Sequence, residues 1–277
     1  MNPYLLAVFV IFVFGSSGAF IKIIGVSPIV LTFFRTAIPS LILFAYFSLV
    51  QRTPLFRTSV RWLLLGSFLN AGRIFLFILS YSYTSIANAV VIYYSWPVFA
   101  TIFSRIWLGE PIPRRNQFLL LLPLLGVTII FSNQNFSSQS QDLIGMSAML
   151  GSAILYSFTV IIFKRTSYQY SGYETVFFQN LLGGIIFLPF AWTQLDDYQW
   201  HTYGLILGFV LSIGVVAFGL YFHALKQMKA ATLSYLSYLE VVVATSYGIL
   251  FFDETLTLHF IAGAALIILS TLLFKKG

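Results

Sequence analysis

The chain has 277 residues, of which 59% are hydrophobic and only 8% are charged, whereas about 25% of the residues in a typical soluble domain are charged. A water-soluble globule of this size is excluded, because the polar residues are too few to cover it and the apolar excess must face lipid. The formal net charge is +7 and there is no cysteine, which excludes disulfides, thiolate metal sites and cysteine nucleophiles. The basic balance could indicate nucleic-acid binding, but the positions of the basic residues favour membrane orientation instead.

Apolar runs of about 20 residues, each long enough to cross a bilayer as a helix, recur along the chain between short polar breaks. None of them shows the alternation that is typical of a transmembrane strand. We predict an all-α integral membrane protein with ten transmembrane helices, at residues 4–24, 28–49, 61–81, 85–107, 116–132, 143–163, 173–193, 203–224, 230–252 and 257–274. The connections are too short to hold a soluble domain, so we predict a single membrane domain over residues 1–277.

The basic residues are distributed unevenly among the predicted connections. With ten spans and a cytoplasmic amino terminus, twelve of the fifteen Lys and Arg residues fall on the cytoplasmic side. Only Lys22 falls on the outer side, while Arg35 and Arg73 lie within spans. Because cytoplasmic connections are enriched in Lys and Arg, this asymmetry supports the span count and places both termini in the cytoplasm.

The two halves of the chain match when the sequence is shifted by 144 residues. The shift aligns Phe33 with Phe177, Tyr94 with Tyr238, and Glu110 with Glu254. Each half contains five predicted spans, so the second half enters the membrane in the opposite sense to the first. We therefore predict two inverted repeats, residues 4–132 and 143–274, that meet around a cavity near the membrane midplane.

Three segments carry a resemblance to a known family. They are FGSSGAFIKIIGVSPIVLTFFRTAIPSLIL in the first two spans, ANAVVIYYSWPVFATIFSRIWLGEPI in the fourth, and KAATLSYLSYLEVVVATSYGILFFDETL in the second half. The chain resembles the EamA family of the drug/metabolite transporter superfamily over essentially its whole length, which implies ten helices in two five-helix repeats. Val241 stands where the family places proline, so it remains open whether the ninth helix bends as the fourth does at Pro97. YYSWP is most similar to the aromatic-amino-acid exporter branch of that family.

Ionisable side chains near span centres are the candidate site residues, because a charge there costs about 2.5–3.5 kcal/mol on insertion scales. Glu240 lies near the centre of the ninth span and aligns with Trp96 across the repeat. Tyr93 shares a helix face with Trp96, and Ser237 shares one with Glu240. We predict that these faces form two walls of one cavity, where Glu240 binds a substrate ammonium or carries a coupling proton. In the alternative, Glu240 ties helices together by pairing with an arginine or a hydroxyl.

Arg73 lies in the middle of the third span, with Asn70 one turn before it on the same face. Its guanidinium could hold a substrate carboxylate through bidentate contacts, or it could neutralise Glu240 in a structural pair. Arg35 lies nearer the end of its span, so we expect it to reach an interface or a helix-end carbonyl. Tyr156 and Tyr238 complete the predicted substrate-binding residues, and the further polar candidates at helix depth are Asn180, Tyr221 and His223.

The sequence contains no phosphate-loop, zinc-protease or serine-nucleophile motif, and we predict no catalytic residue, metal or cofactor. We predict a multi-pass protein of the cytoplasmic membrane that exports a small organic metabolite by alternating access, as a secondary-active or facilitative transporter. Aromatic or otherwise hydrophobic amino acids are the leading substrates, because an aromatic wall with an acid and a guanidinium suits a zwitterion that has an apolar side chain.

Other interpretations stay open at this point. They are an intramembrane enzyme acting on a lipid or small metabolite, a channel or lipid-handling protein, and a transporter of another metabolite or drug class. The expected partners are the substrate and the lipid bilayer, with no nucleic acid. Each chain contains both predicted repeats, so a monomer suffices in principle, and a homodimer is also compatible with the sequence.

Overall fold

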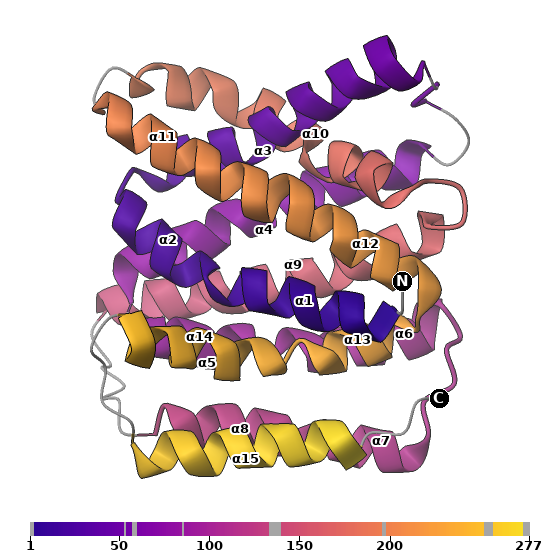
Figure 1. Ribbon diagram of the computed structural model, residues 1–277, viewed down its shortest axis with the longest axis vertical. Coiled ribbons are helices and arrows are strands. Elements are labelled where there is room, and N and C mark those ends of the chain that lie inside the picture. Colours follow the sequence, from indigo (N-terminus) through magenta and orange to yellow (C-terminus); the bar gives the residue numbers. More distant parts are fainter. Residues whose placement is uncertain are drawn as a thin grey trace.

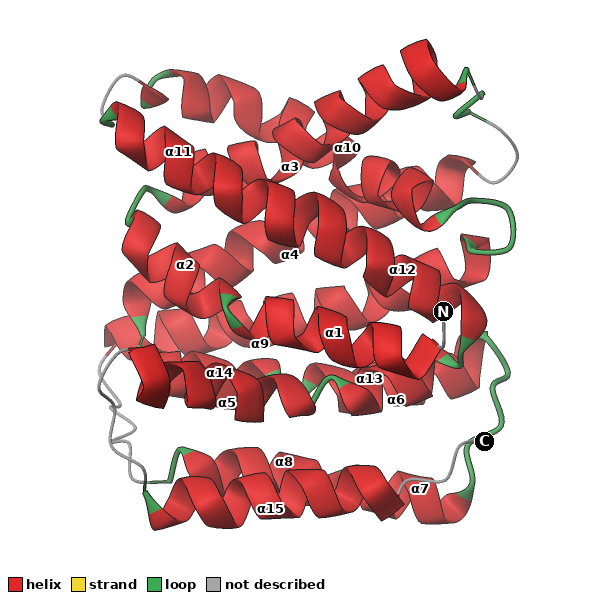
Figure 2. Cartoon of the chain, viewed as in Figure 1, coloured by secondary structure: helices red, strands yellow, loops and turns green. Residues whose placement is uncertain are grey.

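The computed structural model describes residues 3–52, 54–56, 60–84, 86–132, 140–195, 198–251 and 257–273. Within these ranges the chain forms helices and connecting loops and no strand (Figure 2). The helix axes lie roughly along one common direction, which is horizontal in Figure 1, and the chain runs both ways along it. An all-helical chain is the expected result for such an apolar sequence, because a helix satisfies its backbone hydrogen bonds internally and needs no water to do so.

The described helices are α1 (Pro3–Gly15), α2 (Ser17–Ile24), α3 (Pro28–Ala45), η1 (Tyr46–Gln51), α4 (Val60–Tyr83), α5 (Ile86–Tyr93), α6 (Trp96–Trp107), α7 (Arg114–Leu119), α8 (Leu121–Ile130), α9 (Ser140–Thr166), α10 (Gly172–Trp192), α11 (Trp200–Phe209), η3 (Val210–Ala217), α12 (Phe218–Gln227), α13 (Ala230–Leu236), α14 (Leu239–Phe251) and α15 (Leu258–Leu273). The segments η1 and η3 are π-helical. In the described chain, seven continuous stretches are long and apolar enough to cross a bilayer, and α15 is a shorter apolar helix.

Two of the long helices begin at serine caps. The Ser27 Oγ accepts a hydrogen bond from the backbone N–H of Val30 at 3.3 Å and starts α3. At the start of α10, the Ser171 Oγ accepts from Glu174 N at 3.2 Å, and Glu174 Oε2 accepts from Ser171 N at 2.7 Å. Such caps satisfy backbone donors that have no partner inside the helix, so they fix where the two helices begin.

Small residues allow α3 and α10 to cross closely. A Cβ atom added to Gly184 would lie 2.9 Å from the Ala37 Cα, and one added to Gly183 would lie 2.6 Å from Thr36 Cγ2. The Thr36 hydroxyl donates to the Thr32 carbonyl at 2.7 Å, within its own helix. Close approach at small residues is typical of helices packed in a membrane.

The helix pairs α5–α6 and α13–α14 are both interrupted near the middle, and they run in opposite directions with α6 packed beside α13 (Figure 1). The first break lies at Tyr94 and Ser95, just before Pro97, and the second lies at Ser237 and Tyr238. The ninth predicted span is therefore interrupted, although it lacks the proline of the fourth. Around this second break the backbone forms tighter i→i−3 hydrogen bonds, such as Tyr238 N to Tyr235 O at 3.2 Å, which replace regular α-helical bonds.

The helices α8 and α15 form a separate pair at the lower edge of the bundle in Figure 1. Their backbones meet at Gly126 and Gly263, where an added Cβ on Gly126 would lie 2.8 Å from the Gly263 carbonyl oxygen. The Tyr235 hydroxyl donates to the Leu119 carbonyl, at the end of α7 just before α8, at 3.1 Å and joins this part of the chain to the interrupted helices. The pair thus packs on the outer side of α5 and α13–α14 through its own small apolar cluster.

Candidate functional site

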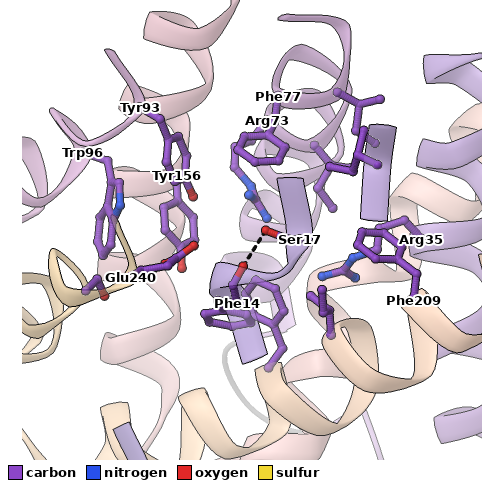
Figure 3. A pocket seen from close by; sticks show the side chains of 16 residues that line it. Phe14, Ser17, Arg35, Arg73, Phe77, Tyr93, Trp96, Tyr156, Phe209 and Glu240 are labelled. Carbon is purple, nitrogen blue, oxygen red and sulfur yellow. Dashed lines mark hydrogen bonds between the residues drawn. The ribbon is translucent and has the colours of Figure 1, made fainter. Parts of the chain in front are cut away.

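A cavity lies among the helices, with about 630 Å³ of space free of protein atoms, including space open to solvent (Figure 3). Helices from both halves of the chain contribute to its walls, with α1 to α6 from the first half and α9, α11, η3, α12 and α14 from the second. Six of the eight predicted substrate-binding residues line it, namely Arg73, Tyr93, Trp96, Tyr156, Ser237 and Glu240.

Aromatic rings form one side of the cavity. Trp96 is only 1% exposed and lies edge-on to Tyr156, with ring centroids 4.6 Å apart. Tyr93 stacks on the same tyrosine, with centroids 6.1 Å apart. The Ser157 hydroxyl donates to the Trp96 carbonyl at 2.9 Å and supports the backbone beside the helix break, while the Trp96 Nε1 has no hydrogen-bond partner. This wall therefore offers flat apolar surface together with a free indole donor.

Arg73 is held by neighbours other than Glu240. Its Nε and Nη2 atoms donate to the Asn70 Oδ1 at 3.3 and 3.2 Å, and its guanidinium lies 4.6 Å from the centroid of the Tyr156 ring. The Asn70 Nδ2 donates in turn to the Gln179 carbonyl at 2.9 Å. Among the described residues, no ion pair joins Arg73 to Glu240. Asn70 thus lies behind the guanidinium and orients it, and does not itself line the cavity.

Glu240 is the one acidic residue among the described residues that line the cavity. It lies in the first turn of α14, directly after the helix break, and its N–H donates to the Ser237 carbonyl at 3.0 Å. In the view of Figure 3, Glu240 lies with Trp96 and Tyr156, apart from Arg35.

Arg35 differs from its sequence-based expectation. We expected it to reach an interface or a helix end, and that prediction is wrong, because Arg35 is 5% exposed and lines the cavity. Its guanidinium lies 5.0 Å from the Phe218 ring centroid, beside the backbone of Gly214 in η3. The missing signal is tertiary, since the sequence does not indicate that a glycine of another helix leaves space there.

Three other polar candidates, Tyr238, Asn180 and Tyr221, are not among the residues that line the cavity. Tyr238 does not line the cavity and packs instead against Tyr94 and Tyr235 in the cluster beside α8 and α15. Asn180 donates from Nδ2 to the Val176 carbonyl in its own helix at 2.8 Å, and Tyr221 packs on Phe14 with centroids 6.0 Å apart. These side chains serve helix packing more directly than the cavity.

Glu110 and Lys164 hold one end of the bundle together. The Glu110 carboxylate accepts from the N–H groups of Ala230 at 3.1 Å and Ala231 at 3.5 Å, which caps the start of α13. The Lys164 Nζ donates to backbone carbonyls at the end of α12. Glu254, which aligns with Glu110 across the repeat, lies outside the described residues.

Comparison with known proteins places this chain in a transport family. The EamA-like transporter family matches residues 1–132 and 143–275. The chain belongs to the EamA-like transporter family. As a member of this family with long apolar helices, the protein is a multi-pass membrane protein.

Curated relatives extend along most of this EamA-like chain. The pseudopaline exporter CntI of Pseudomonas aeruginosa is 28% identical over 286 residues, which cover 99% of this chain and 96% of that relative. The threonine/homoserine exporter RhtA of Salmonella typhimurium is 28% identical and covers 82% of this chain and 74% of its own length. Solute carrier family 35 member G1 of Mus musculus is 25% identical, with coverage of 94% and 74%.

A solved crystal structure has the same fold as this EamA-like transporter. It superposes with a TM-score of 0.79 at 18% sequence identity and covers 98% of this chain and 97% of that chain. At this identity the likeness concerns the arrangement of the helices alone.

Proposed function

We propose that this transporter exports a small zwitterionic metabolite across the cytoplasmic membrane by alternating access, and that the cavity is its substrate site. The observation that carries the proposal is the composition of this cavity. It places a carboxylate, Glu240, and a guanidinium, Arg73, beside an aromatic wall, and the two charges are not joined in an ion pair. Unpaired charges of both signs in a cavity between membrane helices are typical of a substrate pathway.

The proposal includes ten membrane-spanning helices in two inverted five-helix repeats, residues 4–132 and 143–274. The matched family segments fall on nearly the same two halves. The caps Ser27 and Ser171 are separated by the same 144 residues as the helix breaks at Tyr94 and Tyr238. Helices that align across the shift pack together, namely α3 with α10 and α8 with α15, and the aligned interrupted pairs α5–α6 and α13–α14 meet through α6 and α13. Such an arrangement supports a pseudo-two-fold axis in the membrane plane and a rocking motion around a central site.

The orientation follows from the basic residues. In Figure 1, α1 begins and α15 ends at the right-hand end of the bundle, where α6 and α12 also end and α7 begins. These ends carry Arg105, Arg114, Arg115 and Lys226. Since Lys and Arg are enriched in cytoplasmic connections, we place this end and both termini in the cytoplasm.

Each charged group has a proposed role toward an amino-acid substrate. Arg73 binds the substrate carboxylate with the donors that Asn70 leaves free, and Glu240 binds the ammonium group or carries a coupling proton. Trp96, Tyr93 and Tyr156 pack against the carbon skeleton. An amino-acid exporter and the exporter of another small metabolite among the relatives support both the direction and the substrate size.

The test uses purified protein in liposomes and radiolabelled amino acids. The carrier function requires that an amino acid crosses the membrane unchanged, and recovery of a converted compound would contradict it in favour of an enzyme. For Arg73→Gln, we expect affinity for an amino acid to fall about tenfold or more, whereas affinity for the matching decarboxylated amine changes little. Equal losses for the two compounds would overturn the carboxylate assignment. Gly204→Ala is the matched control, because an added Cβ there has no atom within 4 Å.

A second variant tests the role of the carboxylate. Glu240→Gln should weaken the binding of substrates that have an ammonium group. It should also remove any stimulation of uptake by an imposed pH gradient. If binding and the response to the gradient both stay unchanged, the assignment of Glu240 is wrong. If uptake by the wild type does not respond to the pH gradient, the protein is a facilitative carrier, and Glu240 then has only the binding role.

A further inference from the structure

Arg35 is a buried charge that the proposed binding of a simple zwitterion does not use. Its side chain is 5% exposed, lines the cavity, and points toward it in Figure 3. The Nη1 atom is buried and has no hydrogen-bond partner. The guanidinium carbon lies over the Phe218 ring, 5.0 Å from its centroid, and this cation–π contact supplies no formal negative charge to neutralise the group.

The cavity has more positive than negative charge. Among the described lining residues, the fully charged forms are Arg35 and Arg73 against Glu240, which leaves an excess of one positive charge. A buried charge without a partner is costly, especially inside a membrane. A zwitterion of net charge zero would leave this excess in place, so the ligand that complements the cavity has a net charge of −1.

We propose that Arg35 is a second carboxylate-binding residue and that the substrate is an amino compound with two carboxylates and one ammonium group. The inference rests on the proposed transport function and refines the substrate class. Arg73 would bind one carboxylate and Arg35 the other, while Glu240 binds the ammonium group on the far side of the cavity. The aromatic wall contacts the hydrocarbon segment between them.

The backbone beside Arg35 is shaped to hold the guanidinium. A Cβ added to Gly214 would lie 3.0 Å from the Arg35 Nη1, so the absence of a side chain there gives this atom its place. Gly214 lies in the π-helical segment η3, and such segments are frequent at functional sites. The group is thus held against Phe218 and Gly214 from two sides, with its donors left for a ligand.

The experiment compares two amino acids of equal chain length, 2-aminoadipate and norleucine, which differ by a terminal carboxylate. Purified protein in detergent is titrated with each compound, and the unfolding midpoint measures binding. We expect wild-type protein to bind 2-aminoadipate more tightly, by about tenfold or more. Arg35→Gln should abolish this preference with little effect on norleucine, and Arg35→Lys should restore part of it.

A glycine pair provides a control that leaves Arg35 in place. Gly214→Ala should displace the guanidinium and reduce the preference for 2-aminoadipate. Gly208→Ala, in the same stretch of helix with no atom within 4 Å of the added Cβ, should leave it unchanged. A reduction of equal size in both variants would contradict the proposed role of the Gly214 position.

The midpoint of the unliganded protein separates binding from a structural role. Because Arg35→Gln removes a buried charge without a partner, we expect an unchanged or higher midpoint. A lower midpoint together with an unchanged ligand preference would overturn the proposal and make Arg35 structural. If the wild type binds and transports norleucine but not 2-aminoadipate, this inference fails and the proposed function stands. If neither compound binds or crosses the membrane, both fail.

Discussion

Lys164 joins α9 to the end of α12 and offers the sharpest test of how the site is supported. Its Nζ donates to the carbonyl oxygens of Leu225 and Met228, both at 2.7 Å, and its side chain is 7% exposed. The last carbonyls of a helix have no partner inside that helix, so the lysine supplies one. The connection that it holds leads directly into α13, and from there to the break that precedes Glu240.

We expect Lys164→Met to lower the free energy of unfolding by about 2 kcal/mol. Methionine has a similar stem but no donor, so two buried carbonyls lose their partner, at about 1–3 kcal/mol each. Part of this loss is offset, because the variant no longer buries an ammonium group. The expected net loss of unfolding free energy is therefore near the lower end of the combined cost of the two carbonyls.

The measurement is reversible unfolding of the purified protein in mixed micelles, followed by tryptophan fluorescence. Lys226→Met is the matched control, because it removes the same charge from an exposed side chain at the same end of the bundle. It should change the free energy of unfolding by less than about 0.5 kcal/mol. Equal losses in the two variants would refute the reasoning, since net charge and not the carbonyl contacts would then explain the effect.

Four other substitutions probe packing and the orientation of the cavity residues. Gly172→Ala should prevent a stable fold or lower the unfolding midpoint strongly, because the added Cβ would lie 2.5 Å from a backbone carbonyl oxygen of α12. Tyr235→Phe should cost about 1 kcal/mol in unfolding experiments, since its hydroxyl donates to a buried carbonyl at 3.1 Å; Tyr238→Phe should cost less and leave transport unchanged, because that hydroxyl has no partner and lies outside the cavity. Asn70→Ala should weaken amino-acid binding without altering its pH dependence, because it removes the acceptor that orients Arg73; unchanged binding would contradict this role.

The sequence predicts the helical elements well where the signal is local. The apolar run predicted at 173–193 corresponds to α10 at Gly172–Trp192, and the run at 61–81 lies within α4 at Val60–Tyr83. Hydrophobicity over about 20 residues decides these elements, and it can be measured without knowing any neighbour. The repeat shift also brought Trp96 and Glu240 together as candidates, and both line the same cavity.

The hydrophobicity of short segments does not predict in which direction a side chain points. No proline near Ser237 and Tyr238 predicts the interruption of the helix there. The interruption depends on local i→i−3 hydrogen bonds and on packing. Tyr238 is displaced from the cavity because the pair α8 and α15 offers its ring a packing surface on the other side.

The amino-acid sequence by itself determined that this chain lies in a membrane, where its helices run, and which few ionisable groups are available, because each of these depends on the composition of short segments. Only the tertiary structure decided which of those groups meet. Arg73 lies against Asn70 and not Glu240, and Arg35 points inward beside Gly214. Such contacts depend on how helices distant in the chain cross, and the composition of a short segment does not report which helices cross there.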